Sequence, residues 1–367
     1  MSDQEESAFS WERRESILAE LGANGSVRVT QLSKQFKVSP ITIRRDIDAL
    51  ARRGLLLRVY GGAILRGPVE KALTNPATKP VADRHTIGMV VPNMDYYWPQ
   101  IARGAQSVVE HSQSRLLLRG SSYSIKENRA QIARLIEDDL VEGLILAPDL
   151  SGQAGFTLMK WLEKQGVPVM LVERHLPRSL TVSPFESVAT DQRHAARLGV
   201  EHLVSRCHKK IGFLITSASP HGEQLRQGWL EACQDLGLST EGVPTADAVG
   251  FNVPGHEKVL DEIIEQCQSS GTTAVMVHAD REAIALMQRV RDLGLRVPQD
   301  LAILSYDDEF ASLADPPLSS VRPPKQLVGV RAAQLLLNRL DDSTRPIHRL
   351  SLCSELVIRQ TCGPHEE

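Results

Sequence analysis

The stretch VSPITIRRDIDALARRG, residues 38–54, decides the fold of the first part of the chain. Ser39 followed by Pro40 is typical of a helix start, because Ser caps free N–H groups and Pro at the first helical position needs none. Apolar side chains at helical spacing predict one inward-facing stripe, made of Ile43, Ile47 and Leu50. Arg44 and Arg45 lie off this stripe, near the positive end of the helix dipole, where basic residues are disfavoured. A basic pair in that position indicates an anionic partner.

Two shorter helices precede this helix, and a β-rich stretch follows it. WERRESILAELGANG, residues 11–25, has apolar residues at helical spacing and ends in glycines. VTQLSKQFKVS, residues 29–39, predicts a second helix with Thr30 as its N-cap, then a three-residue turn. LLLRVYGGAIL, residues 55–65, predicts a two-stranded wing. Together these elements predict a winged helix-turn-helix, whose last helix enters the major groove of DNA.

The charge of the chain is unevenly distributed. Residues 28–66 contain nine Lys or Arg and two Asp, a net charge of +7, whereas the whole chain carries −3, which leaves −10 for the rest. This asymmetry predicts a basic module attached to an acidic body. The five cysteines show no metal-ligand spacing and indicate free thiols in a reducing compartment. No apolar run approaches the roughly 20 residues that span a bilayer, so we expect a cytoplasmic protein with no membrane partner.

The basic module resembles the DeoR-type winged helix-turn-helix. The pattern of that family, V-S-x-x-T-I-R-R-D-L followed by R-x-x-G-G-A, appears here as V-S-P-I-T-I-R-R-D-I and R-V-Y-G-G-A. The resemblance implies that double-stranded operator DNA is a partner of the protein. It also implies DNA contacts from five side chains: Ser39, Thr42, Arg44, Arg45 and, in the wing, Arg58.

A linker and a larger α/β body follow. RGPVEKALTNPATKPVADRH, residues 66–85, has three prolines and no hydrophobic periodicity, which is typical of a linker. We therefore expect a winged domain over residues 1–66, a linker over 67–85 and a body over 86–367. In the body, short apolar strands alternate with amphipathic helices, predicted at 98–111, 126–138, 191–205, 224–236, 281–293 and 325–340. This βαβα order predicts parallel sheets covered by helices on both faces, and the length of the body suggests two such sheets.

The ends of the predicted strands carry aromatic, acidic and basic residues. Ligands bind at the carboxyl ends of strands in open parallel sheets. There the sequence places NMDYYW (93–98), ERH (173–175), HAD (278–280) and DDEF (307–310), a mixture that suits a sugar. Asp191 and Asp280 also fit helix N-caps. The sequence contains no nucleotide-binding motif, no hydrolase motif and no zinc-binding motif. We therefore expect no cofactor, no metal site and no catalytic residue.

The body resembles the LacI-type effector domain, which is related to periplasmic sugar-binding proteins. TIGMVVP, GLILAP, GLRVPQDLAILSYDD and DPPLSSVRPP carry this resemblance over about 86–360. It implies two lobes with a small sugar bound between them. It also implies effector contacts from Tyr97, Trp98, Arg226, Phe251 and Asp307. The arginine of that family lies three residues before a glycine, whereas Arg226 lies two residues before Gly228.

Three functions are compatible with this organisation. A sugar-responsive transcription regulator fits both parts of the chain. An enzyme on a doubly wound fold would need a nucleophile or metal cluster, and a receptor without DNA function would not need the helix-turn-helix. We favour the regulator, as a repressor rather than an activator and with an unphosphorylated sugar rather than a sugar phosphate. Since operator half-sites lie about 34 Å apart, we expect a homodimer or a tetramer.

Overall fold

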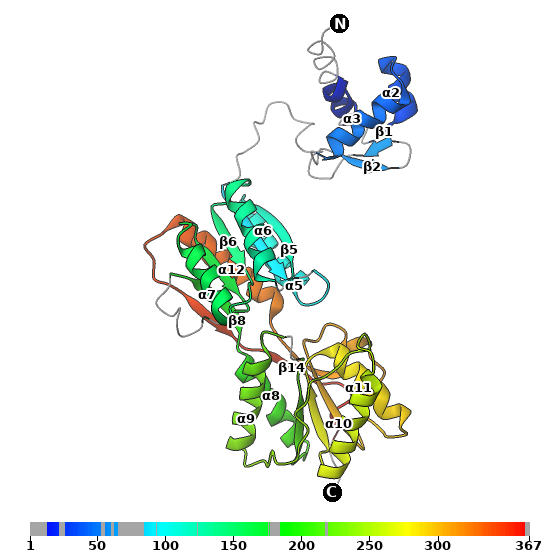
Figure 1. Ribbon diagram of the computed structural model, residues 1–367, viewed down its shortest axis with the longest axis vertical. Helices are drawn as coiled ribbons and strands as arrows, with labels where there is room; N and C mark the ends of the chain where they lie inside the picture. The colour runs from blue at the N-terminus through cyan, green and yellow to red at the C-terminus, as the bar shows by residue number, and fades with distance from the viewer. Residues whose placement is uncertain are drawn as a thin grey trace. The chain divides into compact units, whose positions relative to one another are not determined.

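The computed structural model describes residues 13–21, 26–52, 56–59, 62–64, 84–92, 94–122, 124–174, 176, 184–216 and 219–363. The chain divides into two compact units, unit 1 (Met1–Ala82) and unit 2 (Asp83–Glu367) (Figure 1). The predicted linker, residues 67–85, lies outside the described residues except for its last two. Each unit is described by itself below.

Unit 1 contains the predicted helices and wing. Residues 13–21 are helical, and β1 (Ser26–Arg28), α2 (Val29–Phe36), α3 (Pro40–Arg52), β2 (Leu57–Val59) and β3 (Gly62–Ile64) follow. The wing strands β2 and β3 pair antiparallel, as predicted, but β1 also pairs with β3, so the sheet has three strands. The N-cap prediction for Thr30 is wrong, because α2 begins at Val29 with Arg28 in the capping position. Burial of Val29 in the core accounts for this earlier start.

The core of unit 1 fixes the orientation of α3. The predicted stripe is confirmed, since Ile43, Ile47 and Leu50 are at most 1% exposed. Asp46 is also buried, and it accepts hydrogen bonds from Arg13 Nε at 2.6 Å and Arg14 Nε at 2.8 Å. These two ion pairs join α3 to the helix at 13–21, so α3 can rotate little about its own axis.

We expect Asp46→Asn to destabilise unit 1. The change removes the charge opposite two partly buried guanidinium groups, so the free energy of unfolding should fall by about 1–3 kcal/mol. Urea unfolding of the full chain measures this loss. Glu15→Gln, an exposed acid on the same helix as Arg13, is the matched control and should change little. Equal losses in both variants would contradict the bracing role of Asp46.

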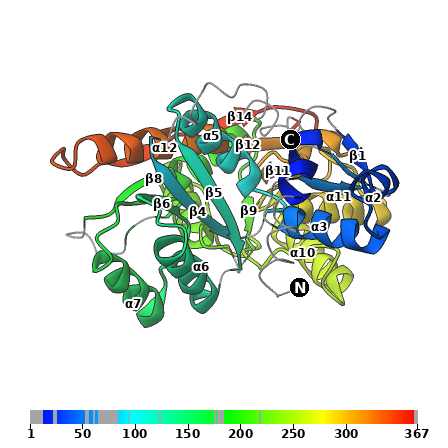
Figure 2. The ribbon, with the colours of Figure 1, turned by 90° about the horizontal axis from the view of Figure 1, so that it is seen from above.

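Unit 2 begins with a six-stranded sheet, the centre of its first lobe. The order is β13-β8-β7-β6-β4-β5, and all neighbouring strands are parallel. The strands are β4 (Thr86–Pro92), β5 (Arg115–Ser121), β6 (Gly143–Leu146), β7 (Val169–Val172), β8 (Glu186–Thr190) and β13 (Arg349–Leu352). Helices α6 (Ile125–Glu137) and α7 (Gly152–Glu163) cover one face, and α5 (Trp98–His111) and α12 (Lys325–Asp341) cover the other (Figure 2).

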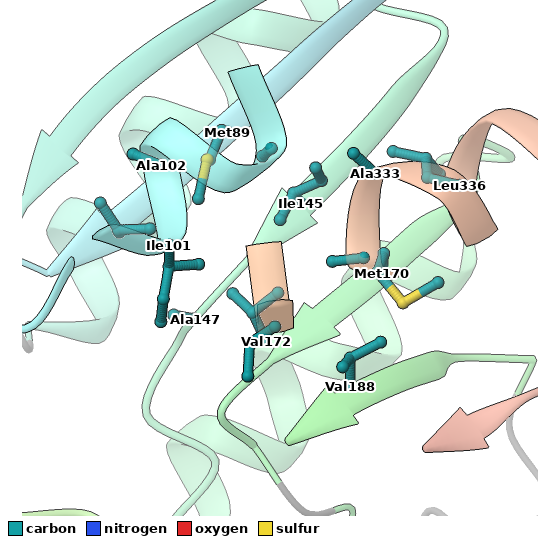
Figure 3. Packing of buried hydrophobic residues seen from close by; sticks show 14 of the residues in the cluster. Met89, Ile101, Ala102, Ile145, Ala147, Met170, Val172, Val188, Ala333 and Leu336 are labelled. Carbon is teal, nitrogen blue, oxygen red and sulfur yellow. The ribbon is translucent and has the colours of Figure 1, made fainter. Parts of the chain in front are cut away.

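The contact between α5 and α12 is close because glycines face it. A Cβ atom at Gly104 would collide with the Gln326 carbonyl, and one at Gly329 with the Ile101 carbonyl. Both helices then pack on the sheet through side chains that are fully buried, as Figure 3 shows for Ile101, Ala333 and Leu336 over Met89, Ile145 and Met170. Helix α12, which follows the second lobe in the chain, is therefore part of the core of the first lobe.

The second lobe is built on a five-stranded sheet of order β14-β12-β11-β10-β9. Its strands are β9 (Ile211–Leu214), β10 (Ala274–Val277), β11 (Ala302–Tyr306), β12 (Ser319–Arg322) and β14 (Glu355–Val357), parallel except for the β12–β14 pair. Helices α8 (Gln192–Ser205) and α9 (Gly222–Asp235) pack on one face, and α10 (His256–Ser270) and α11 (Asp280–Asp292) on the other. A short 3-10 helix, Ala311–Leu313, follows β11. The chain passes between the lobes after β8, after β12 and after β13, so the two predicted sheets are confirmed.

Candidate functional site

The exposed side of α3 carries the predicted DNA-binding residues. The backbone N–H of Thr42 donates to Ser39 Oγ at 3.1 Å, which confirms Ser39 as the N-cap, and the two hydroxyl oxygens lie 2.9 Å apart. Arg44 and Arg45 are exposed, and neither pairs with another described side chain. Arg58 lies in β2, and its side chain is outside the described residues. The structure therefore brings Ser39, Thr42, Arg44 and Arg45 together on one helix of unit 1.

A cavity of about 240 Å³ lies between the lobes of unit 2. The first lobe contributes the start of α5, and the second contributes residues that follow strands β9, β10 and β11. The lining consists of Tyr96, Tyr97, Trp98, Thr216, Ser219, Pro220, His221, His278, Ala279, Arg281, Glu282 and Asp307. Three of the five predicted effector residues, Tyr97, Trp98 and Asp307, thus meet at one place from distant parts of the sequence.

Buried polar contacts hold the aromatic wall of the cavity. The Tyr97 hydroxyl donates to Glu173 Oε1 at 3.0 Å, and Glu173 also accepts the Thr190 hydroxyl at 2.7 Å. Burial raises the pKa of Glu173, and these hydrogen bonds oppose the rise. The guanidinium of Arg174 lies 5.5 Å from the centre of the Trp98 ring and donates to backbone carbonyls, including Ala147 O at 2.9 Å. Both rings are therefore fixed before any ligand arrives.

Asp307 provides a buried carboxyl group at the opposite wall. Its side chain is 3% exposed, and its backbone lies in the left-handed region with φ 99°. Burial raises the pKa of Asp307 to about 8, although Lys325 opposes the rise. Burial also lowers the pKa of His278 to about 4, so this imidazole is neutral at pH 7. Hydrogen bonding by the Tyr96 hydroxyl also opposes the rise at Asp307. His278 Nδ1 has no hydrogen-bond partner among the described residues. These buried polar groups of the cavity can bind a polar ligand.

The raised pKa of Asp307 predicts a pH-dependent stability. The native protein keeps a proton on this group that the unfolded chain has released above about pH 4, so stability falls as pH rises from about 4 to 8. We expect Asp307→Asn, measured without ligand, to exceed the wild type in stability by at least about 1 kcal/mol at pH 8, with the gap closing towards pH 4. Urea unfolding at several pH values measures the gap.

Asp300 is a control for which the shift in pKa, and so the effect of substitution on stability, has the opposite sign. The Arg296 guanidinium holds the pKa of Asp300 at about 2, so that carboxylate stabilises the fold above the pKa of the unfolded chain. Asp300→Asn should therefore be less stable than wild type by a constant amount above about pH 4, and this gap should close as pH falls from about 4 to about 2. A gap of the same sign for both variants, or a pH-independent gap for Asp307→Asn, would contradict the assignment.

Several contacts cross between the lobes beside the cavity. Gln100 Nε2, on α5, donates to both carboxylate oxygens of Glu309 at 2.9 and 3.0 Å. The guanidinium of Arg281 lies 4.9 Å from the centre of the Tyr96 ring. Lys325 Nζ lies 2.7 Å from Glu309 and donates to the backbone oxygen of Asp307. Tyr96, Arg281 and Asp307 also line the cavity, so part of its lining connects the lobes.

Two predicted effector residues lie elsewhere. Arg226 is on the surface of α9, where it donates to Glu223 at 2.9 and 2.6 Å, and Phe251 is 48% exposed and contacts His256 edge-on at 5.9 Å. Neither residue lines the cavity. Sequence reasoning had not assigned nine lining residues to the site by number, although strands β4, β9 and β10 end shortly before them, a signal that could have found them: Tyr96, Thr216, Ser219, Pro220, His221, His278, Ala279, Arg281 and Glu282.

The two predicted helix caps differ in outcome. Asp191 caps α8 by accepting the His194 N–H at 3.0 Å, as predicted. The N-cap prediction for Asp280 is wrong, because α11 begins at Asp280 itself and Ala279 occupies the capping position. The Asp280 carboxylate instead accepts backbone N–H groups of the next loop, from Glu309 at 2.6 Å to Ala311 at 3.2 Å. This buried acid therefore holds the loop that follows Asp307.

Within the described part of the chain, no cluster of His, Cys, Asp or Glu could hold a metal ion. The same residues include no helix that is both long and apolar enough to cross a membrane.

Comparisons with known proteins agree with both units. Residues 13–68 match the DeoR-like helix-turn-helix domain, and residues 200–362 match the periplasmic binding protein-like domain. The arabinose metabolism transcriptional repressor of Geobacillus stearothermophilus is 27% identical over 342 residues, which cover 90% of this chain and 89% of that protein. The HTH-type transcriptional repressor PurR of Vibrio vulnificus is 26% identical over 75% of this chain and 80% of that protein.

Solved structures share the fold of unit 2. A LacI family transcriptional regulator from Enterococcus faecium with bound ribose superimposes with a TM-score of 0.63, at 21% identity, over 77% of this chain and all of the other. The complex of the regulator CelR with cellobiose gives 0.64 at 22% identity, over 88% of this chain and 91% of the other. With transcriptional repressors as its relatives, the chain is a DNA-binding transcriptional regulator. In this protein a DeoR-like helix-turn-helix domain precedes a periplasmic binding protein-like domain.

Proposed function

We propose that this protein is an operator-binding repressor whose affinity for DNA is controlled by a small, unphosphorylated sugar or glycoside. The observation that carries the proposal is the cavity of unit 2, which joins aromatic rings of the first lobe to the buried Asp307 of the second. The related proteins are named as repressors, which favours repression over activation. On the DNA side, we assign the contacts to Ser39, Thr42, Arg44, Arg45 and Arg58.

The chemistry of the cavity supports a neutral sugar. Tyr97 and Trp98 offer ring faces to the C–H side of a pyranose or furanose. The carboxyl group of Asp307 can hydrogen-bond two hydroxyl groups. Ribose and cellobiose occupy the two similar structures named above. The proposal assigns the effector contacts to Tyr97, Trp98 and Asp307 rather than to Arg226 and Phe251, which lie outside the cavity.

A sugar phosphate fits the cavity less well. The acidic residue Glu282 lines it, and burying a phosphate dianion beside another negative charge is costly. The arginine in the lining, Arg281, contacts the aromatic rings of Tyr96 and Phe310 at 4.9 and 5.7 Å. The histidine with a depressed pKa, His278, adds no positive charge at pH 7.

The effector acts by changing the balance between open and closed lobes. A sugar that touches both lobes stabilises the closed state, and only this difference in affinity can shift the equilibrium. In the chain, the first strand of the first lobe follows the winged domain and its linker. Closure would therefore alter how two winged domains of a dimer are held on two half-sites.

The proposal requires more than one copy of the chain on the operator. We expect sedimentation velocity at micromolar concentration to give a dimer or a tetramer, because one winged domain contacts only one half-site. A species that stays monomeric with and without operator would contradict this expectation.

A thermal-shift screen tests the assignment of the effector. A ligand present at about 100 times its Kd stabilises the folded state by about 2.7 kcal/mol, which is readily visible. Neutral mono- and disaccharides form one panel and their phosphate esters a second. We expect a hit in the first panel that is lost in Asp307→Ala. A hit confined to the phosphate esters would overturn the proposal for the ligand while leaving the regulator intact.

A further inference from the structure

Ile41 is an exposed aliphatic side chain at the start of the proposed DNA-binding helix. It is 62% exposed, whereas Ile43, Ile47 and Leu50 on the same helix are at most 1% exposed. Scattered apolar residues on a protein surface need no explanation by themselves. Ile41 differs from these because of its position on α3.

The helical geometry places Ile41 beside Arg45. Each residue rotates an α-helix by about 100°, so Ile41 and Arg45 lie about 160° to either side of Ile43. They are four residues apart and therefore adjacent on the surface directed away from the core. The ion pairs of Asp46 with Arg13 and Arg14 fix this orientation. Any duplex that meets Arg45 on this face also meets Ile41.

The other side chains of the first turn are engaged in capping. Ser39 accepts the Thr42 N–H, and the hydroxyl oxygens of Ser39 and Thr42 lie 2.9 Å apart. Pro40 forms the first helical position. Ile41 is therefore the large side chain that projects from this turn.

We propose that Ile41 reads the C5-methyl group of a thymine in each operator half-site, next to the base contacted by Arg45. This inference rests on the proposed DNA-binding function. In the major groove only thymine presents a methyl group, and apolar side chains contact it. Cytosine presents a polar amino group close to that edge, which an isoleucine would leave unpaired. Four residues of helix rise about 6 Å, so the two bases lie one or two steps of about 3.4 Å apart.

The test removes either the methyl group of the thymine or the side chain of Ile41. An operator is first selected from random duplex DNA with the full-length wild-type protein. Each thymine is then replaced singly by deoxyuridine, which lacks only the methyl group, and affinities are measured for wild type and Ile41→Ala. We expect one thymine per half-site whose replacement weakens wild-type binding about fourfold, the effect of one buried methyl group. Ile41→Ala should bind the thymine and deoxyuridine duplexes equally.

Two further variants make the outcome decisive. Ile41→Val, which keeps part of the apolar contact, should retain part of the sensitivity. Leu140→Ala, which removes an aliphatic side chain of 74% exposure in unit 2, should retain all of it. The role of Ile41 would be overturned if no deoxyuridine replacement changed the affinity of the wild type. It would also be overturned if Ile41→Ala kept the full sensitivity to the replacement. Failure to select any DNA would instead overturn the proposed function on which it rests.

Discussion

Replacing both Arg44 and Arg45 by alanine should weaken operator binding about thirtyfold or more. Each arginine that contacts a base or a phosphate contributes about 1–3 kcal/mol, and the two side chains share one exposed turn of α3. Because neither side chain belongs to the core of unit 1, the loss should occur without loss of the fold. Fluorescence anisotropy with labelled operator, at two or more salt concentrations, measures it.

The salt dependence separates the two kinds of contact. If an arginine binds phosphate, its removal should reduce the slope of log K against log salt concentration by about one. If it reads a base, specificity at that position should relax and the slope should change less. Lys126→Ala with Lys258→Ala, exposed lysines of unit 2, is a control of equal charge change. Unchanged affinity and slope in the double arginine variant would remove α3 from the DNA interface.

Asp307→Ala should abolish the response of operator binding to sugar while leaving sugar-free DNA binding near normal. A coupling of about 1–3 kcal/mol corresponds to a 5- to 150-fold change in operator affinity, and the variant should lose all of it. The reason is that Asp307 is the carboxyl group through which the second lobe would hold the ligand. Titration of the protein–operator complex with sugar measures the response.

A second substitution excludes a backbone effect at this position. Asp307 has φ 99°, a region that alanine disfavours and glycine accepts. Asp307→Gly should therefore recover stability relative to Asp307→Ala, yet it should remain unresponsive to sugar. Arg226→Ala, on the surface of α9, should respond as the wild type does. A wild-type response in Asp307→Gly would contradict the assignment of the carboxyl group to the effector.

Much of the fold could be predicted because its signals are local. Ser39 and Pro40 mark the start of α3 through capping chemistry alone, and apolar runs such as TIGMVV form buried parallel strands. Strand β8, ESVAT, was missed because its polar residues are buried by the tertiary structure. Strand β1 was missed because its pairing partner, β3, lies more than thirty residues later in the chain.

The candidate site was predictable where a strand end determined it. Tyr97, Trp98 and Asp307 meet because the carboxyl ends of parallel strands converge on the space between the lobes. Arg226 is on a helix, where a shift of one residue relative to the family's spacing rotates a side chain by about 100°. It therefore points to Glu223 and not to the cavity. Asp280 looked like a cap because its partners, in the loop at 309–311, cannot be read from local sequence.

Operator affinity of the full-length wild-type protein, measured with and without a saturating sugar found by the thermal-shift screen, tests the central claim most directly. The account predicts that sugar bound between the lobes changes the affinity by about 5- to 150-fold, with weaker binding in its presence for an inducible repressor. A sugar that stabilises the protein through Asp307 but leaves operator affinity unchanged would contradict it.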